Sequence, residues 1–152
     1  MHAAATQQAD LAQLHALEAA FAAAVNHKDA DAAMRVYAPG EALFVFDVVG
    51  PPGVYESWNA YHEALQRFFA SFEGPLHFSI DDLHVTASGD VAYGRSLQHV
   101  RGVRAKDGKA LDYTVRVTNV YRKFDGNWRI VQEHVSLQLD RATFTPILHP
   151  PN

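Results

Sequence analysis

The stretch from residue 113 to residue 136 decides the fold, and it reads YTVRVTNVYRKFDGNWRIVQEHVS. Both halves are rich in β-branched and aromatic residues, which favour strands. Asp125-Gly126 separates the halves, and an Asp-Gly pair between alternating runs is the strongest short-range signal for a β-hairpin. The stretch therefore predicts two long antiparallel strands, over residues 110–124 and 127–139, joined by a two-residue turn.

A two-residue turn also predicts which residues lie opposite each other. A regular ladder pairs Asn119 with Gln132 and Val117 with His134. Because side chains alternate between the two faces of a sheet, one face then combines apolar and polar groups. That face carries Tyr113, Val115, Val117, Asn119, Tyr121, Ile130, Gln132, His134 and Ser136. The opposite face places Arg116 and Glu133 close enough to pair, as expected of a solvated surface or a subunit contact.

The first of these faces predicts a pocket. An isolated buried amide or imidazole costs roughly 1–3 kcal/mol unless it finds a hydrogen-bond partner. Asn119, Gln132 and His134 side by side would form a polar spot on an apolar wall, as ligand pockets usually do. We therefore expect His134 to line a cavity. A hydrogen-bonded structural histidine is the alternative interpretation.

The rest of the chain predicts three helices followed by a meander of strands. Apolar residues recur every three or four positions from Leu11 to Val25, which is typical of an amphipathic helix. Asp29 and Ser57 are suitable N-caps for a short second helix and a third helix. Strands are expected over residues 41–49, 54–56, 76–86 and 91–103, ahead of the two strands described above.

These elements predict an α+β fold in a single domain. No repeat, charge block or linker divides the 152 residues, so one domain is expected over residues 8–138. Residues 1–7 and 139–152 are expected to be irregular.

Composition excludes several classes of site and partner. The chain has no cysteine, which excludes disulfides and thiolate nucleophiles. A net charge of −4 argues against a nucleic-acid partner, and no run of about 18 apolar residues predicts a membrane span. The N-terminal residues do not resemble a secretory signal, so a cytoplasmic protein is expected. The nine histidines form no His-x-His or His-Glu-x-x-His pattern, and neither a metal site nor a cofactor is predicted.

The order of elements and the ending from Gly126-x-Trp128-x-Ile130-Val131 to His134-x-Ser136 resemble a known family. This is the SnoaL-like and ketosteroid isomerase-like branch of the nuclear transport factor 2-like superfamily, over roughly residues 8–138. The resemblance implies a cone-shaped, strongly curved antiparallel sheet, wrapped round a pocket and covered by three N-terminal helices (a cystatin-like roll). It also implies a homodimer through the outer sheet face. Functions in the superfamily range from isomerases, cyclases and dehydratases to association domains.

The resemblance can be tested at individual catalytic positions. Ketosteroid isomerases use a carboxylate base from the first strand, and Asp47 falls close to that place. A carboxylate in an apolar pocket has a raised pKa and can accept a proton from carbon. The isomerases' oxyanion-holding tyrosine falls on Phe21, and their second acid falls near Asn119 or Val120, so steroid isomerisation is not expected. A simple turn residue is the alternative interpretation of Asp47.

Two functions remain open from the sequence. The first is a cofactor-independent isomerase, cyclase or dehydratase that moves a proton on a small apolar carbonyl compound, with Asp47 and His134 exchanging the proton. The side chains expected to contact this ligand are Trp58, Tyr61, Gln98, Tyr113, Asn119, Tyr121 and Gln132. The second is a non-catalytic dimeric ligand-binding or association module, with Arg116 and Glu133 at or near the subunit contact.

Overall fold

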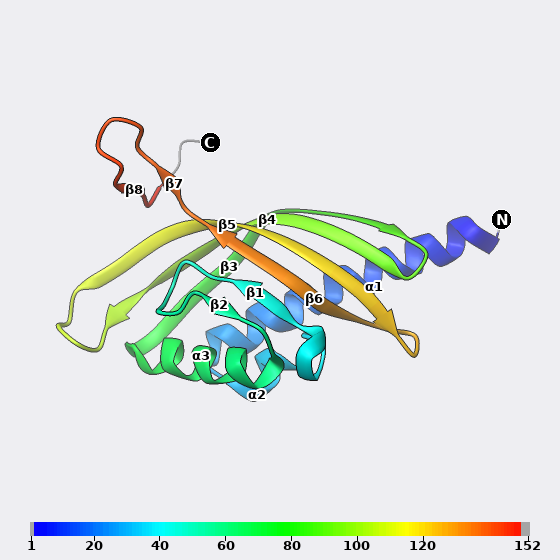
Figure 1. Ribbon diagram of the computed structural model, residues 1–152, viewed down its shortest axis with the longest axis horizontal. Helices are drawn as coiled ribbons and strands as arrows, with labels where there is room; N and C mark the ends of the chain where they lie inside the picture. Colours follow the sequence, from blue (N-terminus) through cyan, green and yellow to red (C-terminus); the bar gives the residue numbers. More distant parts are fainter. Residues whose placement is uncertain (1, 150–152) are drawn as a thin grey trace.

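The computed structural model describes residues 2–149, and it describes the side chains from residue 6 onward. Figure 1 shows three helices on one side of a long, curved sheet, which confirms the predicted α+β class. The helices are α1 (His2–Asn26), α2 (Ala30–Met34) and α3 (Trp58–Ala70), with a short 3-10 helix η1 (Gly40–Ala42). The strands are β1 (Phe44–Phe46), β2 (Val54–Tyr55), β3 (Phe72–Ser88), β4 (Val91–Arg104), β5 (Ala110–Phe124), β6 (Asn127–Ser136), β7 (Gln138–Leu139) and β8 (Pro146–Ile147).

Both ends of the chain are more regular than expected. α1 begins at His2, so residues 2–7 are helical where irregular chain was predicted. The C-terminal segment contains a small antiparallel pair, β7 with β8, which follows the end of β6 and projects away from the main sheet in Figure 1. Of the residues predicted to be irregular, 1 and 150–152 lie outside the described part of the chain.

The main sheet has six strands in the order β2-β1-β6-β5-β4-β3. Neighbouring strands are antiparallel except the pair β1 and β6, which is parallel and places Val45 beside Glu133. The long strands β3 to β6 form the meander that the sequence predicted, while the first strand shrinks to residues 44–46. This arrangement brings the end of β1 next to the last hairpin.

The last hairpin contains a β-bulge that changes its faces. From the turn, Phe124 lies opposite Asn127 and Tyr121 opposite Ile130, as predicted, but Val120 then lies opposite Gln132. Val131 is therefore the extra residue. Because a one-residue shift moves every later side chain to the other face of a strand, the bulge exchanges the two sets of residues beyond it.

The bulge makes two predictions wrong. Gln132 and His134 are exposed, and they do not share a face with Asn119. Glu133, expected on the outer face beside Arg116, is only 2% exposed and lies under the helices. Asn119 lies opposite Glu133 in the observed ladder. The face that covers the core thus carries a carboxylate where an amide and an imidazole were expected.

Helix starts follow the capping residues that the sequence contains. The Asp29 carboxylate accepts a hydrogen bond from the Ala32 amide at 2.9 Å, and the Ser57 hydroxyl accepts one from the Ala60 amide at 3.3 Å. Each bond satisfies a backbone N–H that the first turn of a helix leaves without a partner. Both predicted caps are confirmed.

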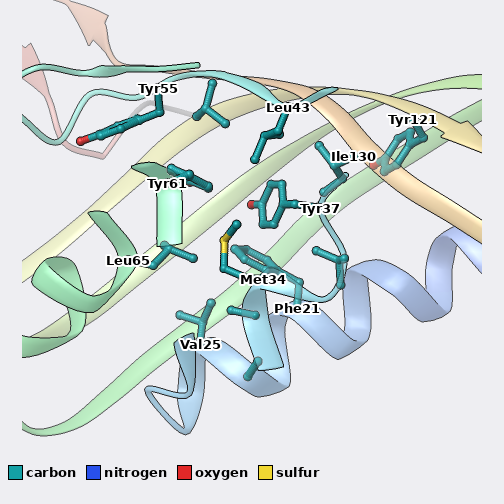
Figure 2. Close-up of a cluster of buried hydrophobic side chains, with 14 of the residues drawn as sticks. Phe21, Val25, Met34, Tyr37, Leu43, Tyr55, Tyr61, Leu65, Tyr121 and Ile130 are labelled. Atoms are coloured by element: carbon teal, nitrogen blue, oxygen red, sulfur yellow. The ribbon is translucent and has the colours of Figure 1, made fainter. Parts of the chain in front are cut away.

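The core lies between the helices and the concave face of the sheet. Figure 2 shows Phe21 and Val25 of α1, Met34 of α2 and Leu65 of α3 converging on the ring of Tyr37. Tyr37 is 2% exposed, and its ring packs edge-on against Phe21 and Tyr61. The apolar packing therefore holds one phenol at the centre of the molecule, next to the buried Glu133.

Gly94 makes room for a second buried phenol. A Cβ at this position of β4 would lie 2.9 Å from the Tyr121 hydroxyl, which is closer than real contacts allow. We expect Gly94→Ala to lower the free energy of unfolding by about 1–3 kcal/mol, because overpacking displaces the Tyr121 ring. Urea denaturation measures this. In a Tyr121→Phe background, which lacks the obstructing oxygen, Gly94→Ala should lower the free energy of unfolding by less. An equal decrease in both backgrounds would contradict this account.

Candidate functional site

A cavity of about 300 Å³ lies between α1, α3, the segment after β1 and the concave face of the sheet. Its volume is at the lower end of the range typical of small-molecule sites. Most of the wall is apolar, from Phe21, Val25, Val48, Val49, Pro51, Ala64, Leu65, Phe68, Phe78, Val100, Val115 and Val135. The polar or partly polar side chains that reach it are Asp47, Tyr55, Tyr61, Arg67, Ser71, Gln98, Tyr113 and Glu133.

Asp47 is both a turn residue and a wall residue of this cavity. Its Oδ1 accepts a hydrogen bond from the Val49 amide at 3.0 Å, the geometry of an Asx turn. Its Oδ2 lies 3.5 Å from the Tyr61 hydroxyl. Burial raises the pKa of Asp47 above its ordinary value, and the hydrogen bonds from the backbone and Tyr61 offset part of that rise. The two interpretations of Asp47 from sequence are therefore compatible.

Glu133 is the second acid of the cavity. Its Oε1 accepts a hydrogen bond from the Tyr61 hydroxyl at 2.9 Å, and its Oε2 accepts one from the Tyr37 hydroxyl at 3.0 Å. No Lys or Arg side chain in residues 6–149 lies within ion-pair distance of it. Burial, followed by the nearby charges of Asp47 and Glu18, raises the pKa of Glu133 to about 8.

Glu18 is a third buried acid, and it is not among the residues that line the cavity. Its Oε1 accepts hydrogen bonds from the Asn119 amide at 3.0 Å and from the Tyr121 hydroxyl. Burial raises the pKa of Glu18. Asn119 and Tyr121, both expected to contact a ligand, therefore bind Glu18 and are not among the residues that line the cavity. Their role in the structure is to hold an acid that α1 carries into the core.

Gln98 and Tyr113 present free hydrogen-bond donors to the cavity. Gln98 is 6% exposed, and its Nε2 has no partner among the described residues. The Tyr113 hydroxyl likewise makes no hydrogen bond within residues 6–149. Gln98 lies opposite Val115, and Val100 lies opposite Tyr113, so the two donors are diagonal neighbours on one face of the sheet. Together they can hold an oxygen atom in the cavity.

A family model that matches most of the chain shows the family to which it belongs. A family model of the SnoaL-like domain matches residues 3–140. The chain belongs to this family. No curated protein gives a significant sequence match to this SnoaL-like protein.

Solved structures with similar folds cover nearly the whole chain. A nuclear transport factor 2-like protein of unknown function from Pseudomonas putida KT2440 is 23% identical, covers 95% of this chain and 98% of its own, and has a TM-score of 0.82. A protein of unknown function from Mycobacterium tuberculosis is 20% identical, with coverages of 93% and 79% and a TM-score of 0.76. A proposed dehydratase from Streptomyces avermitilis is 19% identical, with coverages of 94% and 99% and a TM-score of 0.72. At these identities the similarity concerns the fold of the SnoaL-like protein, and it agrees with the resemblance seen in the sequence.

Besides Asn119 and Tyr121, three further predicted site residues of this SnoaL-like protein lie outside the cavity wall. His134 is exposed on the opposite side of the sheet, where the centre of its ring lies 5.4 Å from the centre of the Phe46 ring. Gln132 lies on the same outer side. Trp58 donates a hydrogen bond from Nε1 to the Met34 carbonyl at 3.0 Å and therefore ties α3 to α2. None of the three is part of the cavity wall.

The structure brings together four of the predicted residues and adds one that was missed. Asp47, Tyr61, Gln98 and Tyr113 all line the cavity. Glu133 was missed because the regular ladder put it outside. A signal was present in the sequence: inward apolar residues occupy even positions at Trp128 and Ile130 but an odd position at Val135, which requires an extra residue between them.

The described chain gives two further results that bear on function. Within residues 6–149, no group of three or more His, Asp or Glu side chains is placed to hold a metal ion. None of the helices in the described part of the chain is long and apolar enough to cross a bilayer.

Proposed function

We propose that this SnoaL-like protein binds a small, uncharged carbonyl compound and moves a proton on it without a cofactor, with Asp47 as the base. The observation that carries the proposal is the Asp47 carboxylate in the wall of an apolar cavity of about 300 Å³, which the unpartnered Gln98 amide also lines. A partly desolvated carboxylate is a stronger base than one in water, so it can remove a proton from carbon beside a carbonyl group.

Gln98 and Tyr113 supply the second requirement of this chemistry. When Asp47 takes the proton, the C–H bond breaks and its electron pair moves onto the carbonyl oxygen as an enolate. Donors aimed at that oxygen stabilise the developing charge most, because they need no reorganisation during the reaction. The free Gln98 amide and the Tyr113 hydroxyl suit this role. A buried amide without a partner costs about 1–3 kcal/mol, which a bound oxygen would recover.

The charges around the cavity favour an uncharged ligand. Two buried acids, Asp47 and Glu133, line it. Arg67 is the one Lys or Arg among the lining residues, and its side chain is 59% exposed and lies 3.8 Å from Glu63. A carboxylate ligand would therefore meet two acids and no buried cation. The size of the cavity, roughly ten times the ~30 Å³ that one water molecule occupies in the liquid, suits a molecule of one or two rings.

Isomerases, cyclases and dehydratases can all begin with this proton removal, so the first test should detect that step alone. We expect the protein to accelerate exchange of the α-protons of 2-tetralone in D₂O, measured by ¹H NMR. Tetralin, which has the same rings without the oxygen, should bind more weakly and should not exchange. If none of several neutral cyclic ketones exchanges faster than in buffer or binds better than its parent hydrocarbon, the proposal is wrong.

An association module is the second candidate, and the outer sheet face supports it. Val91 is 49% exposed and Tyr93 is 60% exposed on the outer side of β4, where Tyr93 lies opposite Val120. Such an apolar strip suits a homodimer through this face. We expect sedimentation velocity to show a dimer and Tyr93→Glu to shift it towards monomer. A control change on the helical side, Glu63→Gln, should leave the dimer intact, and a wild-type monomer would contradict the interface.

A further inference from the structure

The three polar groups at one end of the cavity lie in a row: Asp47, the Tyr61 hydroxyl and Glu133. We propose that Asp47 and Glu133 share a single proton through Tyr61, which makes Glu133 the second proton carrier of the site. The catalytic use of this relay rests on the proposed function, whereas its existence in the free protein does not.

The Tyr61 hydroxyl has a single proton and two carboxylate oxygens that could accept it. The Tyr61 hydroxyl lies 2.9 Å from Glu133 Oε1 and 3.5 Å from Asp47 Oδ2. The remaining oxygens are held by other donors, since Asp47 Oδ1 bonds to the Val49 amide and Glu133 Oε2 to the Tyr37 hydroxyl. The two oxygens that face Tyr61 are therefore the ones free to gain a proton.

One added proton can occupy either end of this row. With the proton on Asp47 Oδ2, that group donates to the Tyr61 oxygen, and Tyr61 donates to Glu133. With the proton on Glu133 Oε1, both hydrogen bonds reverse, and Tyr61 donates to Asp47. Two proton transfers interconvert the states: Asp47 loses a proton to the Tyr61 oxygen, over 3.5 Å, while Tyr61 loses its own to Glu133, over 2.9 Å. Only protons move between the oxygens, no bond between heavier atoms changes, and the total charge of the three groups is unchanged.

The groups around the row keep one proton in it near neutral pH. Glu133 faces Tyr37, Tyr61, Asp47, Glu18 and Tyr121, which are acids or phenols from several elements packed against it. Asp47 faces Tyr61 and Tyr113, and Arg67 lies at the cavity wall. Because no Lys or Arg in the described part of the chain pairs with either acid, ionising both carboxylates at once is unfavourable.

The relay would prepare Asp47 to act as the base. With the shared proton on Glu133, Asp47 is ionised and can accept the proton from the ligand. The row then holds two protons beside the enolate, one on each acid, and because both acids line the cavity either can return one proton to it, which leaves the row with a single shared proton again. Glu133 is thus a proton carrier, and Tyr61 is a positioning residue that connects the two acids.

Carboxyl ¹³C NMR of the ligand-free protein tests the relay directly. We expect the side-chain carboxyl carbons of Asp47 and Glu133 to shift together in one common step, each by a measurable fraction of a full protonation shift, because a single proton leaves the row. Tyr61→Phe should separate the two titrations and move the Glu133 midpoint upward, because its charged form loses a donor. Tyr37→Phe, which removes the other phenol from Glu133, should leave the two carbons coupled.

A second variant keeps the test independent of how well Tyr61→Phe folds. In Asp47→Asn, the Glu133 carbon should titrate alone and at lower pH, because the neighbouring negative charge is gone. A Glu133 step in wild type that leaves the Asp47 carbon essentially unmoved would overturn the relay, as would coupling that survives Tyr61→Phe. These spectra need no ligand, so the relay can be confirmed or overturned even if the ketone exchange assay fails.

Discussion

Asp47→Asn is expected to slow α-proton exchange of 2-tetralone by about 10²–10⁴-fold, the usual contribution of a positioned general base. Asparagine keeps the size of the side chain and an oxygen for the Val49 amide, so the turn after β1 should persist. Affinity for the ketone, measured by calorimetry, should change little, because Gln98 and Tyr113 bind its oxygen in this account.

His134→Ala is the matched control for this change. The imidazole is exposed on the far side of the sheet, so its removal should leave the exchange rate within about twofold of wild type. An equal loss of rate in both variants would point to a general effect on folding. An unchanged rate in Asp47→Asn would exclude this carboxylate as the base.

Glu133→Gln is expected to make the protein more stable than wild type at pH 9 by on the order of a few kcal/mol. The pKa of Glu133 is about 8 in the folded protein, above an ordinary value of 4.5. The folded state therefore binds more protons than the unfolded state between these values. Stability from Glu133 is fully present below about pH 4.5 and is lost as the pH rises through about 8. Glutamine remains uncharged throughout and avoids this loss.

Urea denaturation from pH 5 to pH 9 measures the effect. Wild type should lose stability over this range more steeply than Glu133→Gln, and the two proteins should converge near pH 5. Glu63→Gln is a suitable control, because the Glu63 side chain is 69% exposed and its only ion pair among the described residues is a 3.8 Å contact with Arg67. Parallel pH profiles for wild type and Glu133→Gln would show that Glu133 is not a buried, unpaired acid.

Local sequence signals predicted the elements of this fold well. Asp125-Gly126 set the last turn, and Asp29 and Ser57 set two helix starts, because each of these effects acts over a few residues. These features depend on neighbours along the chain, so one sequence contains them. Asp47 was placed at the cavity by the family resemblance, which puts a carboxylate base near the end of the first strand.

The polar residues of the site were predicted wrongly because of a single inserted residue in the last strand. The bulge at Val131 is stabilised by tertiary packing, in which Ile130 and Val135 both reach the buried side of the sheet. A regular ladder predicts His134 inside the cavity and Glu133 outside. The bulge exchanges them, so that Glu133 lies inside and His134 outside. The hydrogen bond from the Tyr37 hydroxyl to Glu133 joins residues 96 positions apart, which no local pattern predicts.

A crystal structure of the protein with 2-tetralone tests the central claim most directly. We predict that the ketone lies in the cavity with its oxygen within hydrogen-bond distance of Gln98 Nε2 and Tyr113 Oη, and with an α-carbon next to Asp47 Oδ2. A ketone bound outside the cavity, or one whose oxygen points to Asp47 and Glu133 with Gln98 still unpaired, would contradict the account.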